Sequence, residues 1–535
     1  MERAQRLDEV LRSLVEQRPA PAPRVRRTNA SKAFDYAVQS FTSFMLSDTA
    51  AATRFARDAT RVGSGNETDD LLAWACLALA ASADADLDDE QASARMLERV
   101  ARVDPADPTA AFARHVACEA ALASARLDLA AALASVRPAP QEVWSNHPYA
   151  RVMLACEARI AAFTGNITQA LELLSNAGGD GVTGALLRAT RALAAGNAAD
   201  IALMRTLVAE VDAADVAPVD RLGRGVHLLL AFSEIALGDV NGAVRHLLNA
   251  GGGAELEHLT IIDRSLGHEL LIAQAVSERD LESALAWQQL AEKQAHHRVA
   301  APVVLRCRAR VALLAGDPAA AEAAAAEAVE TSTRDGRGVE AAEGEMVLAQ
   351  ARIAARRVPE ATRSLRVAVA SGDSTGHHAV RRSATQVLRP ARRRLPPISG
   401  GGWESLSARE RDIAGLIIAG QSNDQIAAGL HLSVTTVRTH VTRILTAYRV
   451  ATRTGLLAKL HQLPEQPQRP VDLTPRQGDV AALIASGRGN TEIAAALGIS
   501  IKSVETHISA IRDRWQVSSR FDVASQWWDL QQQPR

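Results

Sequence analysis

The chain has 535 residues, 47% of them hydrophobic and only 3% aromatic, with a formal net charge of −1. This length is too great for one hydrophobic core, so we expect several domains. The near-zero charge excludes a basic field over the whole surface, and any attraction to nucleic acid must be local. Long runs of Ala, Leu, Arg and Glu predict an all-α protein.

Nothing in the sequence predicts export, a membrane span or a metal site. The first 18 residues carry charges throughout, and the longest apolar run, residues 71–81, is too short to cross a bilayer. The four cysteines are far apart and form no CxxC or Cys/His cluster, so we expect buried free thiols. We therefore expect a cytoplasmic protein with no membrane partner, no metal and no cofactor.

Residues 1–30 are predicted to be a flexible N-terminal segment. Its first part has an amphipathic helical pattern, with Leu7, Leu11 and Leu14 on one face. Residues 19–30 are rich in Pro and Arg, a composition typical of a flexible chain. A solvated tail is favoured over phosphate contacts for these arginines.

Residues 31–395 read as a string of Ala-rich helices separated by a recurring turn that ends in Asn or Asp. The turn occurs at Asn166, Asn197, Asp239, Asp280 and Asp317. Gly before Asn or Asp supplies a left-handed residue that ends one helix and a side chain that caps the next. The turn recurs mostly at intervals of about 40 residues, and this repetition predicts stacked helical hairpins, an α-solenoid.

This region resembles the tetratricopeptide (TPR) family, although its period is longer and most aromatic signature positions are absent. The resemblance implies a concave surface that holds a peptide, a protein or a small molecule. No single residue identifies that ligand. The adjacent histidines at 296–297 and 377–378 point about 100° apart on a helix, so solvated or capping histidines are favoured over a metal site.

Two short segments are predicted to be linkers. Residues 396–402 (PPISGGG) and 463–470 (LPEQPQRP) contain the residues that break helices. Several arginines between 381 and 394 precede the first linker. Phosphate contacts and a solvated helix face explain these arginines equally well.

One pattern of residues occurs twice, at a constant offset of 67, in residues 403–462 and 471–535. Ser407 with Glu410, and Thr474 with Gln477, fit capping boxes at the start of a first helix. Ser433 is placed to cap a third helix after a turn of about three residues. The spacing predicts four short helices in each copy, with a helix-turn-helix among them.

The third helix of the first copy has an apolar face and an opposite polar face. The polar face carries Thr435, Arg438, Thr439 and Thr442. An arginine can donate two hydrogen bonds to a guanine edge, and threonines can contact phosphates or thymine methyl groups. This face is therefore the predicted DNA-reading surface.

Both copies resemble the helix-turn-helix domain of the LuxR/FixJ/NarL family of bacterial transcription regulators, over about 60 residues each. The resemblance implies base contacts from the outward face of each third helix. These residues are Arg438, Thr439 and Thr442 in the first copy, and Glu505, Thr506 and Ser509, beside Lys502, in the second. The first copy has a net charge of +3 against 0 for the second, so it is the favoured reader.

The resemblance also implies dimerisation through the last helix of each domain. The apolar residues predicted to make this pairing are Leu456, Leu457, Leu460, Trp527 and Trp528. We expect the two copies to pair within one chain as a pseudo-dimer, or else the tryptophans to complete the core of the second domain. The sequence does not decide between pairing within a chain and pairing between chains.

Together these patterns predict a sequence-specific regulator of transcription that binds double-stranded DNA, with RNA polymerase as a further candidate partner. The solenoid would bind a protein or small-molecule ligand. The layout resembles the C-terminal part of MalT-like regulators without their ATPase, since no phosphate-loop motif is present. No catalytic motif is found, so an enzyme is not expected. The alternative is an α-solenoid scaffold whose helix-turn-helix domains act as adapters.

Overall fold

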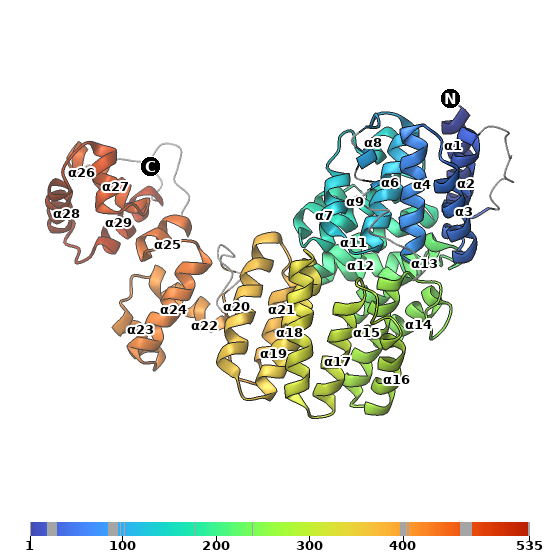
Figure 1. Ribbon diagram of the computed structural model, residues 1–535. Helices are drawn as coiled ribbons and strands as arrows, with labels where there is room; N and C mark the ends of the chain where they lie inside the picture. The colour runs from blue at the N-terminus through green and yellow to red at the C-terminus, as the bar shows by residue number, and fades with distance from the viewer. Residues whose placement is uncertain are drawn as a thin grey trace. The chain divides into compact units, whose positions relative to one another are not determined.

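The computed structural model describes residues 2–18, 29–83, 95–96, 98–100, 102–176, 178–237, 239–395, 403, 406–460 and 473–532. These residues form helices, turns and loops, with no strand among them, so the protein is all-α. The chain divides into two compact units, Met1–Arg394 and Leu395–Arg535 (Figure 1). The two predicted linkers lie outside the described residues. None of the described helices is long and apolar enough to cross a membrane.

Unit 1 is built of helices, most of which follow one another after short connections. They are α1 (Glu2–Val15), α2 (Asn29–Met45), α3 (Thr49–Val62), α4 (Glu67–Ala81), α6 (Pro108–Ala123), α7 (Leu127–Ala134), α8 (Pro140–Val143), α9 (Ala150–Phe163), α10 (Ile167–Leu173), α11 (Gly181–Asn197), α12 (Ile201–Asp212), α13 (Arg221–Leu237), α14 (Val240–Gly251), α15 (Ile261–Glu278), α16 (Leu281–Glu292), α17 (Ala301–Leu314), α18 (Pro318–Arg334), α19 (Gly338–Ala354), α20 (Val358–Thr375) and α21 (Ala379–Leu388).

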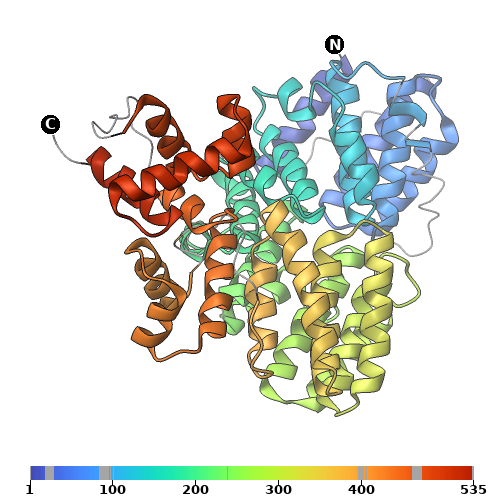
Figure 2. The ribbon, with the colours of Figure 1, turned by 90° about the vertical axis from the view of Figure 1, so that its left-hand side faces the viewer.

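Successive helices of unit 1 pack against each other, and alternate helices also meet. For example, α17, α18 and α19 contact one another in order, and α17 also contacts α19. Figure 2 shows the yellow to orange-yellow helices of this part of unit 1 side by side. Such stacking buries an apolar face of each hairpin against its neighbour. The description as TPR-like remains a prediction.

Most of the predicted turns lie where the sequence places them. Asn166, Asp239, Asp280 and Asp317 each precede a helix, and each side chain accepts a hydrogen bond from a backbone N–H of the first turn. Such caps satisfy donors that the helix itself leaves free. The capping part of the prediction is therefore confirmed at these four positions.

The turn predicted at Asn197 is wrong, because Asn197 is the last residue of α11. The left-handed residue is Ala199, and the cap of α12 is Asp200. Gly196 has a different purpose: a Cβ atom there would lie 2.6 Å from Sδ of Met204. The glycine allows α11 and α12 to approach closely, which in the sequence looks the same as a turn.

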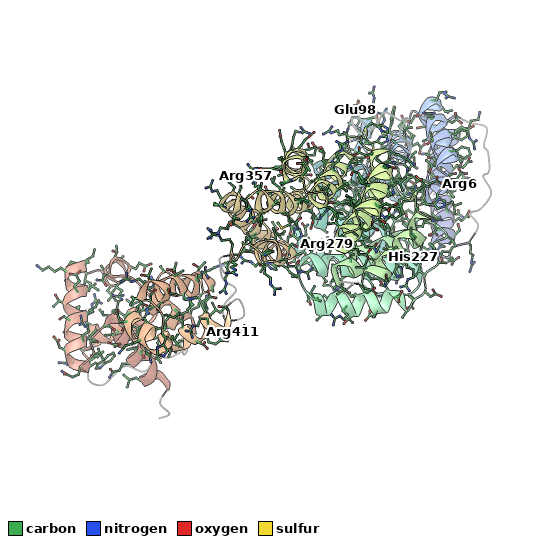
Figure 3. All side chains as sticks on the ribbon, turned by 90° about the horizontal axis from the view of Figure 1, so that it is seen from below. Arg6, Glu98, His227, Arg279, Arg357 and Arg411 are labelled. Atoms are coloured by element: carbon green, nitrogen blue, oxygen red, sulfur yellow. The ribbon has the colours of Figure 1, made fainter. Side chains whose placement is uncertain are left out.

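Helix α1 is packed against the rest of unit 1, in contrast to the flexible segment predicted for residues 1–30. Leu7 and Leu11 are fully buried in a large hydrophobic cluster of the described residues. Arg6, labelled in Figure 3, forms an ion pair with Asp35 at 3.2 Å. The apolar face of the helix therefore finds partners that the local sequence does not reveal. Residues 19–28 lie outside the described residues.

Helices far apart in the sequence also meet within unit 1. Helix α2 contacts α13, α6 contacts α15, and α11 contacts α21. The N–H of Ile261 donates to the carbonyl of Ser82 at 2.8 Å, which ties the start of α15 to the end of α4. One cavity of about 550 Å³ is lined by residues from α2, α4, α6, α9, α11, α13, α15, α17, α19 and α21.

Unit 2 contains the two copies of the duplicated sequence, each with four helices. The first copy has α22 (Ala408–Ile418), α23 (Asn423–Leu430), α24 (Val434–Ala447) and α25 (Arg453–Leu460), and the second has α26 (Pro475–Ala485), α27 (Asn490–Leu497), α28 (Ile501–Trp515) and α29 (Arg520–Gln532). The predicted four-helix arrangement of each copy is thus present.

Candidate nucleic-acid interface

Several helices in unit 2 begin at a residue whose side chain caps the first turn. Ser407 and Glu410 form a reciprocal capping box at α22, and Thr474 and Gln477 form its counterpart at α26. The side chain of Ser433 accepts a hydrogen bond from the N–H of Thr436 at the start of α24. These local bonds set where each helix begins, as the sequence predicts.

An arginine at matching positions holds each copy together. Arg453 at the start of α25 donates to the carbonyl of Gln421 at 2.7 Å and to Oδ1 of Asn423 at 2.6 Å. In the second copy, Arg520 donates to Oδ1 of Asn490 at 2.5 Å. The duplication shows that these positions match, but it does not show that they join the last helix to the turn before the second helix. That role requires the tertiary structure.

Helix α24 has the two faces that its sequence predicts. Val437, Val441 and Ile444 are buried in the core of the first copy. The predicted reading residues are all exposed: they are Thr435, Arg438, Thr439 and Thr442. The polar face is therefore exposed and can contact DNA, because the major groove is wide enough to admit an α-helix.

The charged residues of α24 differ in their surroundings. Arg443 lies 3.6 Å from Oε1 of the buried Glu410, and His440 lies at the same distance from that oxygen. Arg438, by contrast, forms no ion pair or side-chain hydrogen bond with any of the residues that the structure describes. Arg438 is therefore the arginine of this helix whose donors are available to a base edge or a phosphate.

The threonine hydroxyls on this face point back to the helix. Thr439 donates to the carbonyl of Thr435 at 3.1 Å, and Thr442 donates to the carbonyl of Arg438 at 3.0 Å. With the proton used in this way, the hydroxyl oxygen can accept a hydrogen bond, and the side-chain methyl group can contact a base. This arrangement suits contact with a thymine methyl, whereas a bond to a phosphate requires the hydroxyl to rotate first.

Helix α28 presents the corresponding face in the second copy. The exposed residues are Lys502, Glu505, Thr506 and Ser509. Glu505 stands where the first copy has Arg438, so a carboxylate replaces the guanidinium. A carboxylate loses the attraction to phosphate but can accept from the amino group of cytosine.

The two copies pack against each other within the chain, through α25 on α26 and α29. Leu456 and Leu457 are both buried, but they belong to different cores. Leu456 lies in the core of the first copy, and Leu457 lies in the core of the second. Two neighbouring residues of one helix therefore join two domains. The side chain of Leu460 lies outside the described residues.

The contacts between the copies are reciprocal. A Cβ atom at Gly420 would meet Phe521 at 3.9 Å, and a Cβ atom at Gly487 would meet Gly455 at 2.9 Å. Gly420 and Gly487 are equivalent in the duplication, and Phe521 and Gly455 lie at nearly equivalent positions at the start of α29 and α25. Contacts that match in this way are typical of a two-fold dimer interface, here within one chain.

Trp527 and Trp528 are almost fully buried in the core of the second copy, the same core that Leu457 enters. The indole N–H of Trp528 donates to the carbonyl of Ala485 at 3.3 Å. The structure thus places both tryptophans in the domain core, next to a residue from the other copy.

The arginines before the first linker have different surroundings. Arg381 pairs with Asp373 at 2.5 Å, and Arg382 lines the cavity of unit 1. Arg389, Arg393 and Arg394 are exposed. The predicted basic group is therefore divided between an ion pair, the cavity and the surface.

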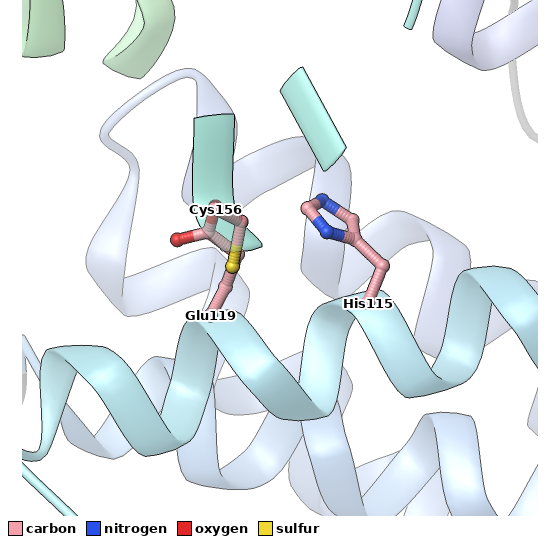
Figure 4. Close-up of side chains that lie close together, drawn as sticks. All are labelled: His115, Glu119 and Cys156. Carbon is pink, nitrogen blue, oxygen red and sulfur yellow. The ribbon is translucent and has the colours of Figure 1, made fainter. Parts of the chain in front are cut away.

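One group of side chains in unit 1 has the types that bind metals. Atoms of His115, Glu119 and Cys156 lie within 4.8 Å of one another (Figure 4). Glu119 already accepts from Arg159 at 2.5 Å, and burial raises the pKa of the Cys156 thiol well above its usual value. A cation would have to displace a guanidinium and deprotonate a buried thiol, so we do not assign a metal to this group.

The comparisons with known proteins match the two copies. Residues 404–459 and 471–526 each match the family described as "Bacterial regulatory proteins, luxR family". Over 52 residues the chain is 48% identical to the "Uncharacterized transcriptional regulatory protein YhcZ" of Bacillus subtilis (strain 168), and 44% identical to the "Response regulator protein VraR" of Staphylococcus aureus and of Staphylococcus saprophyticus. These segments are 10% of this chain and 24–25% of the relatives. The chain thus spans about a quarter of the length of these relatives. Unit 2 therefore carries two LuxR-family helix-turn-helix domains, similar in sequence to those of response regulators.

Proposed function

We propose that this protein is a sequence-specific, DNA-binding regulator of transcription. Helix α24 reads the major groove, and unit 1 regulates binding through a ligand or partner. The observation that carries the proposal is the exposed polar face of α24, on which Arg438 has no partner among the described residues. The two LuxR-family domains and the similarity to transcription regulators support it.

The reciprocal packing of the copies supports a second part of the proposal. Two reading helices that are held in one chain would bind two half-sites without a second subunit. The outward faces of α24 and α28 differ, because Arg438 of the first copy is replaced by Glu505 at the equivalent position of the second. The two half-sites would therefore differ in sequence. The expected operator is therefore asymmetric.

The test is selection from a random-sequence DNA pool with the full chain, at two salt concentrations. We expect a defined motif and an affinity that falls as salt rises. Arg438→Gln should lose the motif, whereas Lys459→Gln, which removes an exposed charge from α25, should keep it. If no motif is enriched and binding does not depend on salt, the scaffold function takes precedence.

A further inference from the structure

The cavity of unit 1 combines a large apolar wall with a dense group of charges. Its apolar part includes Phe41, Leu186, Leu229 and Phe232. Its charged part has seven arginines against five carboxylates. A volume of about 550 Å³ is in the range of small-molecule sites, which are mostly apolar with a few placed polar groups.

Four of the seven arginines are already neutralised by carboxylates of the same cavity. Arg159 pairs with Glu119 at 2.5 Å, and Arg306 pairs with Glu269 at 2.6 Å. Arg310 lies 3.3 Å from Glu269, and Arg337 lies 2.6 Å from Glu340. The charges of these four arginines are therefore already balanced, and they do not require an anionic ligand.

The other three lining arginines, Arg221, Arg224 and Arg382, form no ion pair with the residues that the structure describes. The lining carboxylate of Asp263 forms no ion pair with them either. It accepts from the hydroxyl of Thr260 at 2.6 Å, and its charge acts on Arg221 through space, so one carboxylate faces three arginines. The cavity therefore keeps an excess of positive charge, which a buried site tolerates poorly without an anion.

Arg221 is the best placed of the three to hold an anion. Its Nε donates to the carbonyl of Phe44 at 2.8 Å, and its guanidinium lies 3.9 Å from the centre of the Phe44 ring. Burial lowers its pKa to about 10, so the group is still charged at neutral pH. A guanidinium has five N–H donors, and this contact uses one of them. The Nη donors remain available beside the apolar wall.

We infer that this cavity binds a small organic anion, a molecule with one acidic group on an apolar body. The acidic group would lie at Arg221, and the apolar body would lie against the phenylalanines and leucines. The binding itself can be tested without DNA; only its regulatory consequence rests on the proposed function.

The test uses two dyes with the same aromatic body, anilinonaphthalene sulfonate and the uncharged phenylnaphthylamine. Fluorescence titration of the full chain should show saturable binding of the sulfonate, with affinity about tenfold higher than that of the amine, as expected for one charge-assisted hydrogen bond. Equal affinities for the two dyes would overturn the inference.

Two pairs of variants locate the site. Arg221→Gln should abolish the preference for the sulfonate and leave the amine unchanged, whereas Arg205→Gln, an exposed arginine on α12, should change neither. Gly225 lines the cavity, and a Cβ atom there meets only Leu186, at 3.7 Å. Gly225→Leu should therefore fill the cavity and block both dyes, while Gly225→Ala should not.

The two proposals fail in different ways. Circular dichroism verifies that each variant is folded, and Gly225→Leu replaces a glycine inside a helix, which favours folding. If Gly225→Leu is folded and binds both dyes as before, the site is elsewhere and the inference is wrong. A chain that binds the sulfonate but selects no DNA motif supports the cavity and contradicts the proposed function.

Discussion

Gly487 lies against Gly455, although the two residues belong to different copies of the duplicated sequence: a Cβ atom at Gly487 would be 2.9 Å from Cα of Gly455. Contact at this distance leaves no room for a side chain. The close approach brings the end of α26 onto α25 and accompanies the entry of Leu457 into the core of the second copy. The contact of Gly487 with Gly455 and the burial of Leu457 in the second core thus pair the two domains within the chain.

Leu457→Ala should destabilise the second copy although it lies in the first. Truncating a buried leucine costs about 2–5 kcal/mol, and Leu457 is buried in the core that contains Trp527. Hydrogen exchange measured residue by residue should show faster exchange in α26 and α29. Leu456→Ala is the matched control and should act on α22 and α24 instead. Identical exchange patterns for the two variants would contradict the shared interface.

Replacing Arg438 should weaken DNA binding more than replacing Glu505. Arg438→Ala should weaken specific binding by about 1–3 kcal/mol, because a bidentate base contact is lost. Glu505→Ala removes a carboxylate near the phosphates and should weaken binding less, or strengthen it. Titrations of the full chain with the selected DNA measure both. A larger loss for Glu505→Ala would make the second copy the main reader.

Arg453→Gln should destabilise the first copy by about 1–3 kcal/mol, because the carbonyl of Gln421 and the amide of Asn423 lose a charged donor. Amide hydrogen exchange in α22–α25, recorded at increasing denaturant concentration, measures this loss of stability. Lys459→Gln, on the exposed side of α25, should cost little. An equal effect of both substitutions would mean that helix charge, rather than the arginine clamp, stabilises the domain.

His115 should make unit 1 less stable in acid. Burial lowers the pKa of His115 to about 4, and its Nε2 has no hydrogen-bond partner among the described residues. The unfolded chain binds the proton near pH 6.5 and the folded chain does not. The stabilisation is therefore complete above pH 6.5 and is lost as the pH falls toward 4, by up to about 3 kcal/mol.

His115→Phe keeps a ring against Tyr149 and removes the titrating group. Thermal unfolding of the two proteins between pH 6.5 and 4 should show a shallower decline for the variant. Other buried groups titrate in this range and affect both proteins equally, so the difference isolates His115. Parallel curves would show that this histidine does not control the acid response.

Much of the protein was predictable from local sequence. The capping boxes at Ser407 and Thr474 fix where helices begin, because the side chain and the backbone donors that it satisfies are within three residues of each other. Helical periodicity separates Val437 and Val441 from Arg438 and Thr442, because both faces belong to one helix. The duplication itself identifies two domains of one kind, since the same pattern repeats at an offset of 67.

The tertiary structure alone decided what depends on residues far apart in the chain. Gly196 looks like a turn in the sequence, but it makes room for Met204. Leu457 looks like a residue of its own domain, but it packs in the other copy. Arg221 looks like one charge among many, and only the meeting of α13 with α2 places it over Phe44. Periodicity reports which face of a helix is buried, but long-range packing determines what that face meets.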